Sequence, residues 1–281
     1  MARGSGAGGR YLAGEADRKA RGRRGGANAE RRVIAAGSGA EKEVEEGLRK
    51  YWSPEQIAGR HLLDHGVPLC SHVTIYAFVL SRRKDLVPFL RHGKKRLHRR
   101  RHGTGQREMR REEAKKKRID TRPGVVAERS RVGDWEGDTV VGQEKVLHVL
   151  THVERKSGYL YADKVEGSAE KVRRATERRF GRCPKRKRLT ITYDNGVQFS
   201  EHETLERNLG AAVYFAFPYH SWERGTNENT NGLLRQFLPK GTYFKDLTQR
   251  KLDRYAKLIN TRPRKRLGYR TPEEVFNCVS G

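Results

Sequence analysis

The stretch that decides the fold runs from residue 133 to residue 165 and reads GDWEGDTVVGQEKVLHVLTHVERKSGYLYADKV. Its apolar residues gather in three short runs, Asp138–Val141, Val146–Val153 and Tyr159–Val165, with a glycine between each pair of runs. Short runs rich in Val, Leu and Tyr with apolar alternation, bounded by glycine, are typical of β-strands. We therefore expect three consecutive strands here.

Downstream of these strands, helical and strand-like patterns alternate. The expected elements are a helix over Ser168–Phe180, a strand over Leu189–Tyr193, a helix over Glu201–Leu209, a strand over Ala212–Ala216, a helix from near Glu223 past Leu234, and a helix over Leu247–Ile259. This order predicts an α/β domain of the ribonuclease-H-like kind, with a mixed five-stranded sheet and flanking helices. On such a sheet two central strands lie side by side and the helix that starts near Glu223 faces them.

Three acidic residues fall at informative places in this order. Asp138 and Asp194 lie at predicted strands, and Glu228 lies at the start of a predicted helix. Mg²⁺ and Mn²⁺ prefer oxygen ligands, and two such ions about 3.5 to 4 Å apart can assist both the attacking and the leaving oxygen of a phosphodiester displacement. The three carboxylates therefore predict a site for two Mg²⁺ or Mn²⁺ ions.

Other roles for these acidic residues remain open from the sequence. Asp134 and Glu136 are rival ligands in the first motif, because Glu136 would share a strand face with Asp138. Asp194 can instead form a turn before Asn195-Gly196, and an acidic residue at the start of a helix is favoured by the helix dipole alone.

The composition indicates a polyanionic partner. The formal net charge is +27 over 281 residues, with 33 basic and 15 acidic residues up to residue 132 and 28 basic and 19 acidic residues after it. Such an excess favours nucleic acid. The sequence has no apolar run of 18 residues and no apolar signal-peptide core, so a membrane partner is not expected. The three cysteines form no CxxC pair, which fits a reducing cytoplasmic setting.

The N-terminal half divides into three expected segments. Residues 1–50 are expected to be poorly ordered or partly helical. Residues 51–90 predict a helix-turn-helix-like DNA-binding region, because Ser53 with Gln56 forms a capping-box pattern and Ser71 can cap a second helix after a glycine-containing turn. A helical hairpin that only packs is the alternative. Residues 91–132 are expected to be a basic linker that follows DNA phosphates, since residues 91–118 hold fourteen Lys or Arg and three Glu.

Seven short motifs occur in a fixed order along the chain. They are WSPEQIA (52–58), GDWEGD (133–138), YDNG (193–196), PYHSWERG (218–225), NENTNGL (227–233), PKG (239–241) and NTRP (260–263). In this combination the chain resembles, over about residues 50 to 277, the DDE transposases of the bacterial insertion-sequence family thirty, which are relatives of retroviral integrases.

The resemblance implies a function and a set of site residues. Asp138, Asp194 and Glu228 match the metal-binding triad that cleaves a DNA strand at the end of an insertion sequence and joins the freed 3′-hydroxyl to target DNA. Arg235 matches a basic residue near the substrate phosphate. The implied partners are the element ends, the target DNA and further copies of the chain.

The residues expected to contact DNA are Arg82, Arg83, Lys84, Lys94, Lys95, Arg96, Arg224 and Arg235. Further polar and aromatic candidates near the site are Asn195, Tyr219, His220, Trp222, Asn227, Asn229 and Asn231.

The chain also departs from the family pattern. A glycine-rich start stands where the family usually has a further helix-turn-helix domain, and Val73 stands where an acidic residue is expected. These departures leave a second hypothesis, a truncated DNA-binding remnant without catalysis, beside the transposase. A nuclease that cleaves RNA in RNA-DNA hybrids without joining strands is a third.

Overall fold

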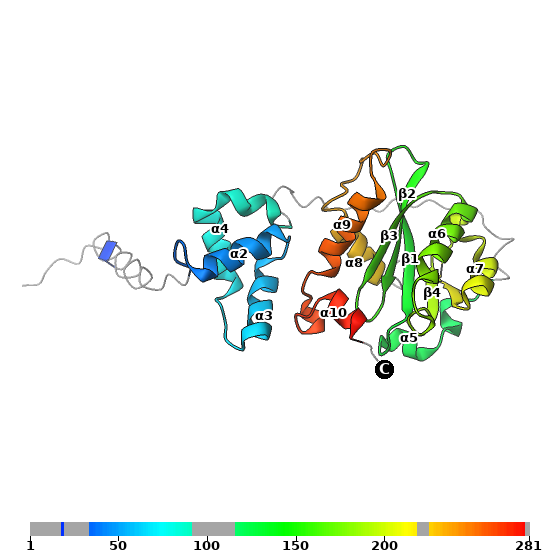
Figure 1. Ribbon diagram of the computed structural model, residues 1–281, viewed down its shortest axis with the longest axis horizontal. Coiled ribbons are helices and arrows are strands. Elements are labelled where there is room, and N and C mark those ends of the chain that lie inside the picture. The colour runs from blue at the N-terminus through cyan, green and yellow to red at the C-terminus, as the bar shows by residue number, and fades with distance from the viewer. Residues whose placement is uncertain (1–17, 20–33, 92–115, 218–224, 279–281) are drawn as a thin grey trace, which may run out of the picture.

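The computed structural model describes residues 18–19, 34–91, 116–217 and 225–278. Most of them belong to two units, a helical unit over 34–91 and an α/β domain over 116–278 (Figure 1). Two of the expected DNA-binding segments, around Lys94–Arg96 and Arg224, lie outside the described residues. In the described parts of the chain, no helix is both long and apolar enough to cross a membrane.

The α/β domain is built on one five-stranded sheet in the order β3-β2-β1-β4-β5. Its strands are β1 (Asp134–Val141), β2 (Leu147–Glu154), β3 (Leu160–Glu166), β4 (Thr190–Tyr193) and β5 (Ala212–Phe215). Strands β1 to β3 pair antiparallel, whereas β4 is parallel to both β1 and β5. This is the topology of a ribonuclease-H-like domain, so the expected fold class is confirmed.

The first strand starts four residues earlier than expected. The sequence pattern placed its start at Asp138, but β1 begins at Asp134 because Trp135 already enters the core and its indole Nε1 donates to the Lys187 carbonyl at 2.8 Å. The remaining four strands lie within one residue of their expected positions at nearly every end.

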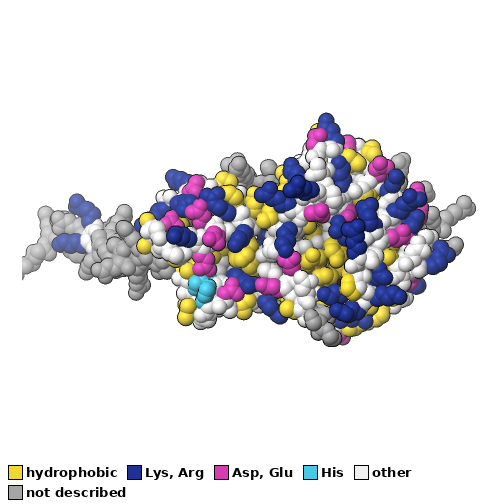
Figure 2. Space-filling model, in the orientation of Figure 1, with side chains coloured by type: hydrophobic (Ala, Val, Ile, Leu, Met, Phe, Trp, Pro, Cys, Tyr) yellow, Lys and Arg dark blue, Asp and Glu magenta, His cyan; other side chains and the backbone are white. Residues whose placement is uncertain are grey.

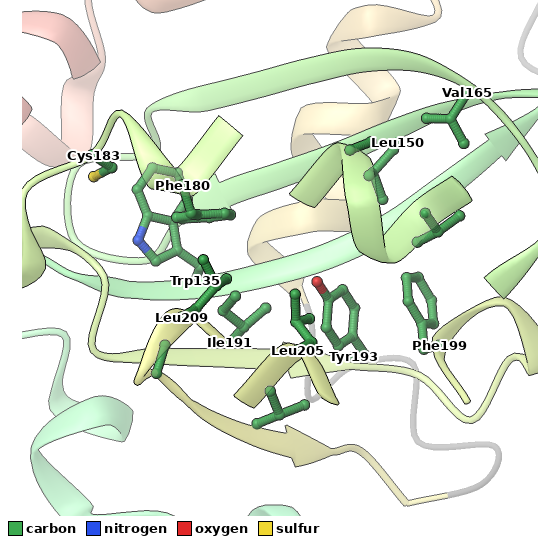
Figure 3. Close-up of a cluster of buried hydrophobic side chains, with 14 of the residues drawn as sticks. Trp135, Leu150, Val165, Phe180, Cys183, Ile191, Tyr193, Phe199, Leu205 and Leu209 are labelled. Atoms are coloured by element: carbon green, nitrogen blue, oxygen red, sulfur yellow. The ribbon is translucent and has the colours of Figure 1, made fainter. Parts of the chain in front are cut away.

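Helices cover both faces of the sheet (Figure 1). On one side lie α6 (Ala169–Gly181) and α7 (His202–Leu209), and on the other lie α8 (Gly225–Leu234) and α9 (Gln249–Asn260). Figure 3 shows the core on the α6 and α7 side, where the Trp135 indole meets the Phe180 ring edge-on at 4.9 Å between centroids. A second core between α8, α9 and the sheet contains Val140, Val149, Leu233, Leu252 and Ile259.

Strand alternation decides which residues of β1 face which helices. Trp135 belongs to the core on the α6 and α7 side and Val140 to the core on the α8 and α9 side. Because successive side chains on a strand point to opposite faces, Glu136 and Asp138 share the face of Val140. They therefore point toward α8.

The helical unit consists of α2 (Gly39–Arg49), α3 (Pro54–His65), α4 (His72–Arg82) and the 3-10 helix η1 (Lys84–Phe89). The capping box of Ser53 with Gln56 and the Ser71 cap are both confirmed. The unit's apolar core comprises Ile34, Val44, Leu48, Ile57, Ile75, Phe78, Val79 and Leu86. It therefore begins well before residue 51, since α2 supplies part of the core.

Close packing explains why α2 joins this unit. A Cβ added to Gly47 would lie 2.6 Å from Ile57 Cγ1, so the absence of a side chain lets α2 approach α3. Val44 and Leu48 are fully buried in the contact.

The last part of the expected linker, residues 116–132, belongs to the α/β domain. The described residues from 116 onward include a 3-10 turn, η3 (Ile119–Thr121), and a short helix, α5 (Gly124–Glu128), and Val126 is fully buried. The backbone at Arg118 forms a parallel bridge to Phe215 at the end of β5. This segment therefore extends the sheet edge, and residues 92–115 lie outside the described chain.

The two units contact each other through charged pairs and aromatic rings. Arg60 of α3 donates to both carboxylate oxygens of Glu274 in α10 (Pro272–Asn277), each at 2.8 Å. The Tyr51 ring lies between the rings of Phe89 and Phe237, with centroids 5.4 and 5.0 Å away. The contact therefore joins one surface of the helical unit to the C-terminal part of the α/β domain.

Candidate active site

The pairing of β1 with β4 brings the first two acidic candidates together. The paired Cα positions are Asp134 with Thr190, Trp135 with Ile191 and Glu136 with Thr192. Continuing this register by two residues places Asp138 opposite Asp194, immediately after β4. Both side chains are half-buried and share one face of the sheet. Strand pairing therefore brings together two acidic residues that are far apart in the sequence.

Asn227 attaches helix α8 to the same face. Its backbone N–H donates to Glu136 Oε2 at 2.9 Å, and its side-chain amide donates to the Glu136 carbonyl at 3.0 Å. Thr151 of β2 donates its hydroxyl to Asn227 Oδ1 at 3.2 Å. Asn227 is fully buried by these contacts, so the position of the next residue, Glu228, is set by the sheet.

Asn231 connects α8 directly to the first aspartate. Its Nδ2 donates to Asp138 Oδ2 at 2.9 Å, while the backbone N–H of Thr139 donates to Asp138 Oδ1 at 2.8 Å. Glu228 and Asn231 are three residues apart on α8 and are therefore neighbours on the helix surface. The contact brings the Glu228 side of α8 toward the edge where Asp138 and Asp194 lie.

The two rival carboxylates of the first motif are held by arginines. Glu136 is fully buried and forms an ion pair with Arg155. Asp134 is buried and accepts hydrogen bonds from Arg131 and from the Thr190 hydroxyl, the latter at 2.8 Å. Both acidic groups therefore have structural partners, and the sequence alternative in which one of them replaces Asp138 gains no support.

A buried aromatic group supports the site from the opposite face of the sheet. Tyr193, the residue before Asp194, stacks on Phe199 with centroids 4.1 Å apart, and its hydroxyl lies 2.8 Å from His152 Nε2. Burial, helped by the charge of Arg179, lowers the pKa of His152 to about 3, so this imidazole is neutral at pH 7. Burial also raises the pKa of Tyr193.

The donors around Asp138 fit a hydrated divalent cation. Carboxylates and an amide oxygen are the hard ligands that Mg²⁺ and Mn²⁺ prefer. Asn231 Oδ1 is buried and has no hydrogen-bond partner among the described residues, and a metal-bound water could donate to it. Among the described residues, Asp138, Asp194 and Glu228 are not a group with all ligand atoms within 4.8 Å of one another. This wider spacing is expected without metal, because three like charges repel one another. It also suits a site for two ions, whose ligands are spread more widely than those of one ion.

The expected DNA-contacting residues of the helical unit differ in exposure and in their ion pairs. Arg82, at the end of α4, and Lys84, at the start of η1, are exposed. Arg83 is instead held by carboxylates, since its guanidinium donates to Glu41 at 3.1 Å and to Glu45 at 2.9 Å, and also to Asp85. These partners raise the pKa of Arg83. Its charge is compensated inside the protein, which argues against a free phosphate contact.

Arg235 lies just beyond the end of α8. It is half-buried, its guanidinium donates to the Leu238 carbonyl at 3.4 Å, and burial lowers its pKa. Of the other polar candidates, Asn195 fixes the chain after β4, because its Nδ2 donates to the Ala216 carbonyl at 2.8 Å. Tyr219, His220 and Trp222 lie outside the described residues.

Two arginines near the site were not predicted as site residues. Arg122 Nη1 donates to the Thr192 hydroxyl at 3.0 Å, and Arg118 Nη1 donates to Asn195 Oδ1 at 3.1 Å. Thr192 shares the face of Glu136 and Asp194, so Arg122 reaches the acidic face of the sheet. In the sequence both arginines belong to the expected basic linker over residues 91–132, whose many other basic residues hide their particular positions.

The chain is similar in sequence to several insertion-sequence transposases. No protein-family model matches the chain. A transposase for insertion sequence element IS4351 from Bacteroides fragilis is 38% identical over 248 residues, which is 85% of this chain and 73% of the relative. The transposase InsI for insertion sequence element IS30A from Escherichia coli (strain K12) is 36% identical over 250 residues, 84% of this chain and 63% of the relative.

Among the solved structures to which the chain is similar is the catalytic core domain of BIV integrase, which is 25% identical with a TM-score of 0.41; the match covers 51% of this chain and 92% of that chain.

The sheet topology defines the class of the domain as ribonuclease-H-like. The similarity to the Bacteroides fragilis protein then defines the family more closely. The chain belongs to the IS30 family of insertion-sequence transposases. It spans between 63% and 73% of the length of these two relatives.

Proposed function

We propose that this protein cleaves DNA at the ends of an insertion sequence and joins the freed 3′-hydroxyl ends to target DNA, with Asp138, Asp194 and Glu228 as ligands for two Mg²⁺ or Mn²⁺ ions. One observation carries the proposal. The β1 and β4 register, continued two residues beyond the pair of Glu136 with Thr192, sets Asp138 opposite Asp194, and Asn231 of the helix that bears Glu228 donates to Asp138. The family membership supports the same chemistry.

The residues of the chain have separable roles in this proposal. When bound, the two divalent ions would make an oxygen nucleophile more reactive and stabilise the leaving oxygen of the phosphodiester. Asn231 orients the Asp138 carboxylate through its 2.9 Å hydrogen bond. Asn227 fixes the first turn of α8 and with it the backbone of Glu228. Arg122, which reaches the acidic face through Thr192, and Arg118, which donates to Asn195 next to Asp194, are proposed to attract the DNA backbone.

The charge distribution supports DNA as the substrate. Figure 2 shows Lys and Arg side chains spread over the visible face of the α/β domain and the helical unit, with acidic side chains between them. Each phosphate that such groups neutralise adds a slope of about −0.9 to log K against log salt concentration.

We propose Arg82, Lys84 and Arg235 as further DNA contacts, and Lys94, Lys95, Arg96 and Arg224 remain proposals from the sequence. Because two element ends must be brought together, we also propose that the chain acts as a homo-oligomer on DNA.

The test uses labelled element ends incubated with the full chain and Mg²⁺ or Mn²⁺. Asp138→Asn should keep the Tm of the wild type and lose strand cleavage and joining by about two orders of magnitude or more. Asp246→Asn, at an exposed position in the loop before α9, is the matched control and should remain active. Cleavage that persists in Asp138→Asn would refute the ligand assignment.

A second substitution separates structural from catalytic carboxylates. Glu136→Gln breaks a buried ion pair and should lower stability by about 3–5 kcal/mol, in contrast to Asp138→Asn. A wild-type protein that binds DNA with a steep salt dependence but never cleaves it would favour the DNA-binding remnant instead.

A further inference from the structure

A second group of metal-ligating side chains lies in the helical unit, outside the candidate active site. Glu43 of α2 and His61 and His65 of α3 each offer one ligand atom, and these atoms all lie within 4.8 Å of one another. It is the one such group of three among the described residues. None of the roles proposed above uses these side chains.

The contacts within the group are close. His61 Nδ1 lies 2.8 and 2.9 Å from the two carboxylate oxygens of Glu43. The His61 and His65 rings lie 4.4 Å apart between centroids, at 38°. His61 is mostly buried, with 14% of its side chain exposed, whereas His65 is exposed at the surface. Figure 2 shows histidine side-chain atoms at the surface of the helical unit. One ligand is therefore held by packing and another is open to solvent, so an ion can enter.

The sequence spacing explains why the two histidines converge. Residues four apart on an α-helix lie on the same face, and His at i and i+4 is a recurrent way to present two imidazoles to one zinc ion. The carboxylate comes from the neighbouring helix, whose position is fixed by the contact of Gly47 with Ile57 and by buried Val44. Two packed helices thus hold the three ligands, which is a better support than a loop.

The donor set selects the kind of cation. Two imidazole nitrogens and one carboxylate oxygen suit Zn²⁺, Co²⁺ or Ni²⁺, whereas Mg²⁺ prefers oxygen ligands only. Zinc–nitrogen and zinc–oxygen bonds of about 2.0–2.2 Å at tetrahedral angles set ligand atoms about 3.3–3.6 Å apart. The 2.8 Å contact of His61 with Glu43 would therefore open by about half an ångström or a little more when an ion replaces the shared proton. Side-chain rotation provides that movement.

A simple hydrogen-bonded pair of Glu43 with His61 does not explain the whole arrangement. It leaves the close approach of the exposed His65 ring without a role. Cys70 is a half-buried free thiol near this group, and burial together with the Glu43 charge raises its pKa. It does not belong to the group within 4.8 Å, so we leave it out of the ligand set. Water would complete the coordination.

We propose that Glu43, His61 and His65 bind one Zn²⁺ ion, or a similar divalent transition-metal ion, which links α2 to α3. The ion would stabilise the unit that the sequence predicts to bind DNA. This site is separate from the carboxylates proposed for catalysis and does not depend on their role.

The test is metal binding by the full chain in excess Mg²⁺, which would occupy the carboxylate site proposed for the α/β domain and does not compete for imidazole. Metal-free protein is titrated with Co²⁺, whose visible absorption becomes strong when protein ligands hold it in a four-coordinate site, and then with Zn²⁺ against a chromophoric chelator. The wild type should bind one equivalent and show the visible band, and Zn²⁺ should raise its Tm. His65→Ala should lose the band and bind Zn²⁺ at least tenfold more weakly.

Two further variants keep the test decisive. Glu43→Gln should weaken binding in the same way, and it serves if His65→Ala proves poorly folded by circular dichroism. His72→Ala replaces an exposed histidine of the same unit outside the group and should bind as the wild type does. Equal affinity and stoichiometry in wild type, His65→Ala and Glu43→Gln would overturn the proposal, and so would a wild type that shows no Co²⁺ band.

Discussion

Gly137 is the position at which a single methyl group should disturb the candidate active site most. It lies between Glu136 and Asp138 on β1, and its missing side chain faces the core on the α6 and α7 side. A Cβ built on Gly137 would lie 2.1 Å from Tyr193 Cε1 and 2.5 Å from Cδ1. Carbon atoms in contact are normally about 3.5–4.0 Å apart, so Gly137→Ala creates an overlap of more than 1 Å.

The Tyr193 ring has little room to relieve this overlap. It is 1% exposed, stacks on Phe199 and is hydrogen-bonded through its hydroxyl to His152. Either β1 or the end of β4 must therefore move, and these carry Asp138 and Asp194. Overpacking of this kind costs about 1–3 kcal/mol, which for a domain of this size lowers Tm by about 2–12 °C. A displacement of about 1 Å at the reacting groups should reduce strand transfer about 100-fold.

Thermal unfolding and strand-transfer rates of Gly137→Ala measure both effects. Gly181→Ala is the matched control, because its added Cβ meets nothing within 4 Å at the end of α6, and alanine should stabilise that helix by up to about 1 kcal/mol. In a Tyr193→Leu background the added methyl should cost less, giving a coupling of about 1 kcal/mol or more. Additive effects of the two substitutions, or a Gly137→Ala protein with wild-type Tm and activity, would refute the reasoning.

Three further predictions concern pH and the contact between the two units. Burial lowers the pKa of His152 to about 3, so the unfolded chain takes up a proton near pH 6.5 that the folded protein excludes. The contribution of His152 to the free energy of unfolding is therefore complete above that pH and falls by about 1.4 kcal/mol per pH unit as the pH drops toward 3. Urea unfolding of His152→Gln should lack this pH dependence between pH 6.5 and 5. Glu274→Gln keeps an acceptor for its capping box but removes the charge that pairs with Arg60, and since both side chains are partly exposed it should cost only about 0.2–1 kcal/mol, less at high salt. In Gly59→Ala the added Cβ would meet the Tyr269 ring at 2.3 Å, so amide hydrogen exchange of α3 and of residues 265–269 should speed up together, and unchanged exchange would argue against this contact.

Local signals in the sequence predicted local structure well. The capping box of Ser53 with Gln56 is correct because both partners lie within one helical turn. The strand runs were also found, since alternation depends only on nearby residues. Helix α2 was harder, because its mixed charges hide Val44 and Leu48, whose burial depends on Ile57 and on the rest of the unit.

The site shows the same limit at longer range. Motifs select Asp138, Asp194 and Glu228 as candidates, whereas the position of Asp138 relative to β4 and α8 depends on the β1 and β4 register and on the Asn231 contact. The sequence predicts Arg83 as a DNA contact but does not show that the carboxylates of Glu41 and Glu45 reach it. Ion pairs between distant segments are decided by packing, which no local pattern encodes.

Glu136 links the stability of the sheet to the geometry of the candidate site. Its buried carboxylate is paired with Arg155 and also accepts the backbone N–H of Asn227 in the first turn of α8. A negative charge there is favoured by the positive end of the helix dipole. Removing Arg155 would leave this carboxylate buried without its cation, at a cost of about 3–5 kcal/mol. The carboxylate would then move toward water or take up a proton, and either change would weaken the hydrogen bond that fixes the start of α8. An Arg155 substitution should therefore displace Glu228, because Arg155 is linked to α8 through Glu136 and Asn227.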